Sequence, residues 1–215
     1  MAPAGAEARR ARERAGARRE DIRVVDVAFP LGGGSLPADH PLALLDAVRA
    51  RLAWFGAEPG SGIHPLRTNA TDYGVALLAQ RAKLVLRVPE ARVSAVLALG
   101  GCALDVSGSR LDLGEGRTRP LRASATLAAG AVTFGQADVE GFERSARAAL
   151  AEIGVDCGFI SGRRRAAGAG SRTIAGFSLA LHGLQPDDSL VVQALGLGGE
   201  RALGWGLFVP AKAIA

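Results

Sequence analysis

The chain has 215 residues, of which 48% are hydrophobic, and it carries a formal net charge of +5. This composition excludes a disordered chain and supplies the core of one large or two small globular domains. No apolar run reaches the roughly 18 residues that a membrane-spanning helix needs, and the N-terminus has no signal-like apolar segment. We therefore expect a soluble, cytoplasmic protein with no membrane partner.

The positive charge is concentrated at the N-terminus and in the second half of the chain. Residues 1–23 carry a net charge of +3, residues 24–116 carry −1, and residues 117–215 carry +3. Such a surplus favours a polyanionic partner. The two cysteines, Cys102 and Cys157, lie far apart among apolar residues. We therefore expect no disulfide framework, no metal site and no cofactor.

The first part of the chain predicts a strand–helix–strand–strand–helix–strand unit. Residues 1–22 are expected to be an Ala/Arg-rich flexible extension, and a domain is expected to occupy residues 23–116. Its first helix follows Asp39 and Pro41, which suit an N-cap and a first turn. The expected elements are, in order, a strand over residues 24–29, a helix with Leu44, Val48, Leu52 and Phe55 on one face, strands over 73–78 and 83–88, a helix opened by Pro89 and Glu90, and a strand over 110–113.

Residues 117–215 repeat this order and are expected to form a second domain. Its elements are a strand over residues 125–134, a helix with Val139, Phe142, Ala146, Leu150 and Ile153 inward, a hairpin over 158–181 whose tip is the basic run 163–172, a helix after Asp187 and Asp188, and a strand over 207–209. Two βαββαβ units in tandem predict an α+β fold of two ferredoxin-like domains.

A glycine-rich loop over residues 196–206 has five glycines around the charged pair Glu200 and Arg201. Glycine carries no Cβ, so successive backbone N–H groups can approach a phosphate closely, and an arginine can add charge. The alternative is a turn that joins a helix to the last strand. The RNA-binding candidates in this loop are Gly196, Gly198, Gly199, Arg201, Gly204 and Gly206.

Further arginines extend the basic surface. Arg163, Arg164, Arg165 and Arg172 flank a Gly/Ala-rich hairpin tip, which favours a basic finger along an RNA groove over a merely solvated loop. Arg117, Arg119 and Arg122 either line the same cleft or form a charged linker. Only 5% of the residues are aromatic. The chain therefore lacks a base-stacking sheet, and we expect recognition of RNA shape and phosphate, with Trp205 as a core anchor.

Four segments carry a family resemblance: Val25-Asp26-Val27-Ala28-Phe29-Pro30-Leu31, Gly62-Ile63-His64-Pro65-Leu66-Arg67, Gly162-Arg163-Arg164-Arg165 and the loop 196–206. Over roughly residues 24–210 the chain resembles the CRISPR-associated repeat-RNA endoribonucleases of the RAMP superfamily, in a myxobacterial-type branch. The resemblance implies ferredoxin-like domains and metal-independent cleavage of CRISPR repeat RNA to mature crRNA. It further implies 2′-hydroxyl attack, a 2′,3′-cyclic phosphate product, and other CRISPR effector subunits as potential partners.

Metal-free RNA cleavage needs a base, an acid and charge beside the phosphate, and histidine suits both proton roles. Of the three histidines, His64 lies in a polar loop, with Pro65 after it and Arg67 three positions along. It also occupies the place of the family's catalytic histidine, so it is the predicted catalytic residue; an ordinary loop histidine is the alternative.

Residues that assist the catalytic histidine are less clearly marked. His40, Tyr73 and Arg67 are the candidates for this auxiliary role. His40 also suits a helix cap beside Asp39, and the role of His182 stays open. Neither Tyr73 nor Lys83 falls in a recognisable motif, so a single-histidine mechanism is an alternative, as is help from Ser61. A non-catalytic RAMP-type RNA-binding subunit of a CRISPR effector complex is the competing function, and a small-molecule enzyme would need a motif that the sequence lacks.

Overall fold

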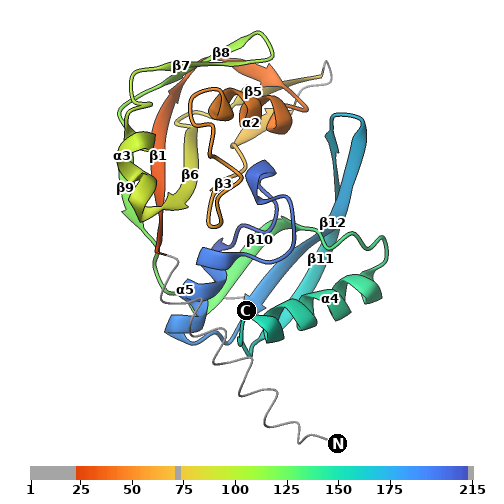
Figure 1. The fold of residues 1–215 in the computed structure, drawn as a ribbon. Coiled ribbons are helices and arrows are strands. Elements are labelled where there is room, and N and C mark those ends of the chain that lie inside the picture. Colours follow the sequence, from red (N-terminus) through yellow and green to blue (C-terminus); the bar gives the residue numbers. More distant parts are fainter. Residues whose placement is uncertain (1–22, 71–73, 213–215) are drawn as a thin grey trace, which may run out of the picture.

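The computed structural model describes residues 23–70 and 74–212 (Figure 1). The expected N-terminal extension and Tyr73 lie outside these ranges. Within them, no helix is both long enough and apolar enough to cross a membrane. The chain forms two sheet-and-helix halves, with the last helix and the loop after it lying between them (Figure 1).

The first half is built on an antiparallel sheet of strands that differ in length. Their order is β3-β6-β1-β8-β7, and β9 also pairs with β1. Helices α2 (Pro41–Arg49) and α3 (Val93–Leu97) contribute buried side chains to the same core as the sheet. The strands of the sheet are β1 (Val24–Gly32), β3 (Gly62–Ile63), β6 (Lys83–Pro89), β7 (Ala103–Val106), β8 (Ser109–Leu113) and β9 (Arg117–Pro120).

One predicted strand belongs to a different sheet. The segment expected over residues 73–78 is β5 (Val75–Leu78), which pairs with β2 (Ser35–Pro37) and β4 (Thr68–Ala70) in a separate three-stranded sheet. The main sheet instead takes the two-residue strand β3 beside β6. A strand this short has no period-two pattern, so the sequence could not reveal it. A single 3₁₀ turn, η1 (Glu90–Arg92), precedes α3.

The second half follows the predicted order, with a four-stranded antiparallel sheet ordered β11-β12-β10-β13. Asp138 caps the long helix by accepting from the backbone N–H of Gly141 at 2.7 Å. The elements are β10 (Thr126–Val132), α4 (Val139–Glu152), β11 (Gly158–Ala169), β12 (Arg172–His182), α5 (Pro186–Leu195), η2 (Arg201–Leu203) and β13 (Val209–Pro210). This is the strand order of a ferredoxin-like unit, and it confirms the predicted α+β class.

Three details differ from the expected second half. The hairpin turns at residues 170–171, so the basic run begins within β11 rather than forming the tip. The last strand starts at Val209, two residues later than expected, and Leu207 and Phe208 are buried just before it. Strand β9, which begins at the expected boundary between residues 116 and 117, extends the sheet of the first half.

Candidate active site between the two halves

His64 lies at the point where the shortest strand of the first sheet ends. β3 pairs with β6, and the His64 backbone N–H donates to the Val85 carbonyl at 2.9 Å, which fixes the chain just before Pro65. The imidazole is largely buried, with 14% of its side chain exposed. Its Nε2 donates to Asp26 Oδ1 on β1 at 3.2 Å. The ring is therefore held by a carboxylate while part of it remains open.

Asp26 is in turn held by the buried Arg87 of β6. Arg87 donates from Nε and Nη2 to the two carboxylate oxygens, at 2.8 and 3.1 Å. Burial raises the pKa of Asp26, but the hydrogen bonds from His64 and Arg87 and their charges outweigh it, and the net pKa lies well below its usual range. Asp26 is therefore ionised at neutral pH and can only accept hydrogen bonds.

His64 and His40 line the same small cavity. It has a volume of about 170 Å³ and is closed on one side by Ala202 and Leu203 of η2, in the glycine-rich loop. His40 is 9% exposed, and its Nδ1 lies 2.9 Å from the Pro37 carbonyl oxygen. A carbonyl accepts only, so Nδ1 of His40 carries the proton and Nε2 is the basic nitrogen. Two histidines from distant segments thus line one cavity where the halves join.

The other auxiliary candidates lie elsewhere. Arg67 is exposed and does not line this cavity, although Leu66 beside it does. Ser61 is buried and its hydroxyl is engaged, since it donates to the Glu58 carbonyl at 2.6 Å and accepts from the Gly56 N–H at 3.0 Å. His182 ends β12 with its exposed ring over Gly158. The structure thus brings together His64 and His40 but not Arg67.

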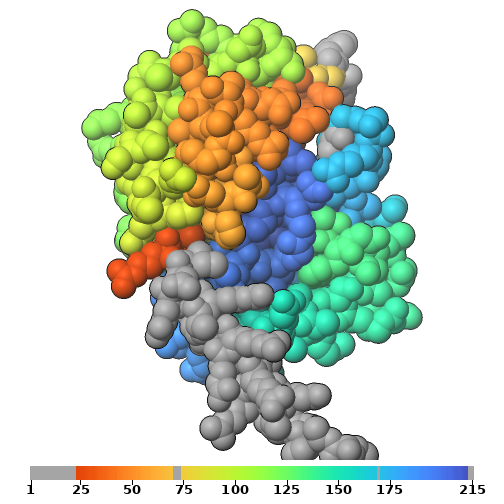
Figure 2. Space-filling view, in the orientation of Figure 1, coloured from red at the N-terminus to blue at the C-terminus, as the bar shows by residue number. Residues whose placement is uncertain are grey.

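Most glycines of the 196–206 loop pack against the protein's own backbone. A Cβ on Gly198 would lie 2.3 Å from the Thr133 carbonyl oxygen, and one on Gly206 would lie 2.1 Å from that of Leu197. Gly196 and Gly204 are also buried. Figure 2 shows the surface of this loop, in blue, between the orange surface of the first half and the green surface of the second. Close packing therefore requires these glycines, and Gly198 and Gly199 form the exposed edge.

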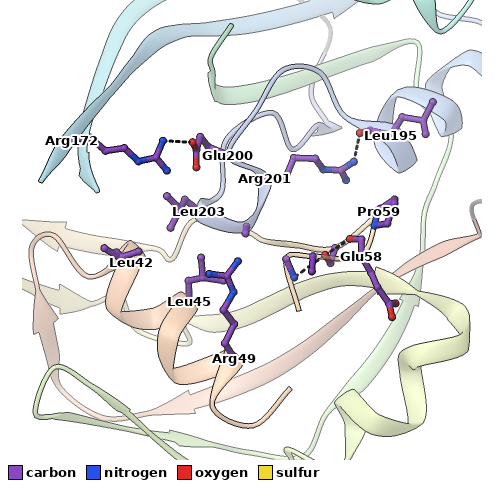
Figure 3. Close-up of a pocket in the computed structure, with 15 residues that line it drawn as sticks. Leu42, Leu45, Arg49, Glu58, Pro59, Arg172, Leu195, Glu200, Arg201 and Leu203 are labelled. Carbon is purple, nitrogen blue, oxygen red and sulfur yellow. Dashed lines mark hydrogen bonds and ion pairs between the residues drawn. The ribbon is translucent and has the colours of Figure 1, made fainter. Parts of the chain in front are cut away.

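Arg201 points into the protein rather than toward solvent. Its Nη1 donates to the carbonyls of Ala194 and Leu195 at the end of α5, the first at 2.9 Å, and burial lowers its pKa to about 10 (Figure 3). Arg172 is exposed, and its Nη1 forms an ion pair with Oε1 of Glu200 at 2.6 Å. Arg172 and Arg201 both line a cavity of about 530 Å³. Arg201 Nη1 is engaged by the two carbonyls, so its predicted contact with phosphate would have to use Nε or Nη2, which have no hydrogen-bond partner within the described residues.

The three consecutive arginines all lie exposed on β11. Arg164 is opposite Phe177 and Arg165 is opposite Gly176, and the register slips between Ser161 and Arg164. Directly opposed residues of an antiparallel pair share a face, so Arg164 and Arg165 project to opposite sides of the hairpin. The three arginines therefore do not all lie on one face of the hairpin.

Asp26 and Arg87 are functional candidates that the sequence reasoning missed. Asp26 is flanked by apolar residues of β1 and Arg87 by apolar residues of β6, and the two charges have opposite signs. That pairing of signs was a usable signal, because a charge in a central strand is rarely buried without a partner.

Comparison with known proteins identifies the family. The model of the family described as "Cas6 Crispr" matches residues 25–213. The chain belongs to the Cas6 family. It is 36% identical over 187 residues to the "CRISPR-associated endonuclease Cas6" of Myxococcus xanthus (strain DK1622), covering 86% of this chain and 81% of that protein.

Solved structures agree with the fold. "An RAMP protein binding different RNA substrates" aligns with a TM-score of 0.64 at 10% identity, covering 87% of this chain and all (100%) of that one. The structure titled "Characterization of a Cas6-related gene from Pyrococcus furiosus" aligns with a TM-score of 0.61 at 8% identity, covering 86% and 98%. At such low identity these likenesses bear on the fold, and they confirm the tandem ferredoxin-like architecture.

Proposed function

We propose that this chain is an endoribonuclease that cleaves CRISPR repeat RNA to mature crRNA. Membership of the Cas6 family and 36% identity to a protein named as a CRISPR-associated endonuclease support this activity. The observation that carries the proposal is the cavity shared by His64 and His40 at the junction of the two halves. Two proton-transfer groups beside one cavity meet the requirement for moving protons to and from a phosphodiester.

The proposed reaction needs no metal ion. A histidine removes the proton of the ribose 2′-hydroxyl, and the 2′-oxygen attacks the adjacent phosphorus. The bond from phosphorus to the 5′-oxygen breaks, and that oxygen takes a proton from a second, protonated histidine. The products are a 2′,3′-cyclic phosphate and a free 5′-hydroxyl. His64 is the proposed principal catalytic residue, and its Nδ1 is the nitrogen left free by the bond from Nε2 to Asp26.

His40 is the proposed auxiliary group. Its protonated Nδ1 is held by a backbone carbonyl, which leaves Nε2 as the basic nitrogen of a ring that lines the same cavity. Each ring therefore keeps one nitrogen out of its anchoring bond, and that nitrogen can accept a proton or, once protonated, donate one. Arg67 and Tyr73 remain proposed auxiliaries, Arg67 as an exposed charge three positions beyond His64.

RNA binding is proposed along the exposed basic hairpin and the loop edge. Arg163, Arg165 and Arg172 supply exposed positive charge, and Gly198 and Gly199 are exposed and carry no side chain, with the Gly199 N–H donating to the Thr133 carbonyl at 3.0 Å. The buried glycines of the loop and Arg201 contact the rest of the protein beneath this surface, and so hold the loop in place. Within the proposal, the basic surface binds the repeat RNA and the histidine cavity receives its scissile phosphate.

The deciding experiment incubates the purified protein with the repeat RNA of its host in excess EDTA. Cleavage should persist and should stop when a single 2′-hydroxyl, upstream of the scissile phosphate, is replaced by hydrogen. Loss of cleavage in EDTA with rescue by Mg²⁺ would refute the metal-independent reaction. Tight binding without cleavage of either RNA would favour a non-catalytic RNA-binding subunit.

A further inference from the structure

The strand register places one acid and one arginine side by side on the face of the first sheet that is turned away from its helices. Val25, Val27 and Phe29 of β1 belong to the core of the first half, so Asp26 points to the opposite face. Asp26 is directly opposite Arg87 of β6. Arg87 is also opposite Gly62, two residues before His64. The sheet thus brings His64, Asp26 and Arg87 together from three strands.

Arg87 connects this group to the second half of the chain. Its side chain is 1% exposed, and its Nη1 donates to the carbonyls of Gln193 on α5 and Phe208, at 2.8 and 2.9 Å. Its other two bonds go to Asp26. Among the described residues, the hydrogen bonds of the guanidinium therefore go either to Asp26 or to the second half.

The Asp26 carboxylate controls which nitrogen of His64 carries the proton. Its Oδ1 accepts from both Arg87 Nε and His64 Nε2. Because an ionised carboxylate cannot donate, His64 must carry its proton on Nε2, and Nδ1 is left as the lone-pair nitrogen. The other charged or titratable groups around the pair are Arg119, opposite Asp26 on β9, His40 in the shared cavity, and Arg201 near Arg87. None of these hydrogen-bonds His64 within the described residues.

We propose that Asp26 is a positioning residue that holds His64 in the Nε2–H tautomer, and that Arg87 makes this arrangement depend on docking of the second half. The inference rests on the proposed function of His64, but the tautomer itself is a property of the free protein. A purely structural ion pair between Asp26 and Arg87 needs no histidine. The shared Oδ1 is what extends the pair into the site.

The test compares Asp26→Asn with Asp112→Asn. Asp112 is an exposed carboxylate on β8 that pairs with Arg110 at 2.9 Å, so its variant makes the same chemical change away from His64. An amide at position 26 accepts through its oxygen only, and where its NH₂ takes the place of Oδ1 it donates to His64 Nε2, which then carries the lone pair. We expect this variant to switch the tautomer and to lower the single-turnover cleavage rate by roughly a hundredfold or more, since the wrong nitrogen is then protonated. RNA affinity should be unchanged.

The tautomer is read directly from ¹⁵N chemical shifts of the ring nitrogens in protein with labelled histidine, at a pH where imidazole is neutral. Histidine substitutions assign the three residues. Wild-type His64 with its proton on Nδ1 would overturn the proposal, whether or not the Asp26 variant folds. An Asp26→Asn protein that is folded at the assay temperature and cleaves at the wild-type rate would overturn it as well. If His64→Ala cleaves normally while the Nε2–H tautomer is found, the proposed catalytic role fails and the positioning contact stands.

Discussion

Two neighbouring arginines of β11 provide a matched test of where RNA binds. Arg165 lies opposite Gly176, on the face that also carries Arg172, whose partner Glu200 belongs to the glycine-rich loop. Arg164 lies opposite Phe177, which packs in the core beside α4. We therefore expect RNA to contact Arg165 and not Arg164, although each substitution to Ala removes the same charge.

The size of the effect follows from counterion release. Each phosphate contact contributes roughly 0.7 for a single strand, and about 0.9 for a duplex, to the slope of log affinity against log salt concentration. Arg165→Ala should flatten the slope by about that amount, and Arg164→Ala should leave it unchanged. Replacing Arg163, Arg164 and Arg165 together should cost about 1.4–1.8, because at most two of three consecutive strand residues share a face.

The assay is a fluorescence anisotropy titration of repeat RNA, repeated across a series of salt concentrations. The RNA carries a 2′-deoxy substitution at the scissile nucleotide so that cleavage does not disturb the equilibrium. Equal flattening by Arg164→Ala and Arg165→Ala would refute the reasoning, since it would mean that net charge matters and strand face does not. Flattening by Arg164→Ala alone would place the RNA on the helix side of the hairpin.

Three further predictions concern the cavity, the loop and the buried acid. His64→Ala should lower the single-turnover cleavage rate by on the order of a hundredfold or more, and His40→Ala by less, with RNA affinity nearly constant; a wild-type rate removes the residue from the mechanism. Gly199→Ala should keep the melting temperature, because no atom lies within 4 Å of its added Cβ, yet weaken RNA binding; Gly198→Ala should melt earlier, because its φ is +74° and its Cβ meets Thr133. If both melt alike, loop packing does not depend on Gly198. The lowered pKa of Asp26 means that its ionised form stabilises the fold above the ordinary aspartate pKa near 4 and that this stabilisation is lost as the pH falls. The melting temperature of the wild type should therefore exceed that of Asp26→Asn by more at pH 7 than at pH 3, and an equal gap at both pH values would contradict this.

Elements with a clear period were predictable from the sequence. The inward positions of α4 recur at three- and four-residue spacings, and Phe142, Ala146 and Leu150 are buried as expected. The 158–182 hairpin was also predictable, because long alternating strands flank a glycine-containing turn. β3 was not, since two residues carry no period, and its pairing depends on a tertiary contact with β6. The predicted histidine site nevertheless lies directly after that unpredicted strand.

The hydrogen-bond network around His64 could not be predicted from local sequence patterns, for a different reason. Asp26 and Arg87 are 61 residues apart, and only the register of β1 on β6 brings them together. The remaining hydrogen bonds of Arg87 go to the backbone carbonyls of Gln193 and Phe208. Any residue type would supply such a carbonyl, so the sequence does not mark these two positions. Side-chain identity could therefore have suggested the ion pair but not its connection to the second half.

The glycine-rich loop shows how one signal can have two physical causes. A missing Cβ permits the backbone to approach a phosphate, but it equally permits the backbone to approach another backbone. A Cβ on Gly204 would lie 3.0 Å from the Ile63 carbonyl oxygen, one residue before His64, so this glycine lets the loop close over the histidine cavity. The loop glycines therefore let the second half pack closely on the first, and the RNA contacts proposed for this loop are left to its exposed edge at Gly198 and Gly199. On this view the loop and the buried Arg87 serve one purpose, because each makes the environment of His64 depend on contact between the two halves.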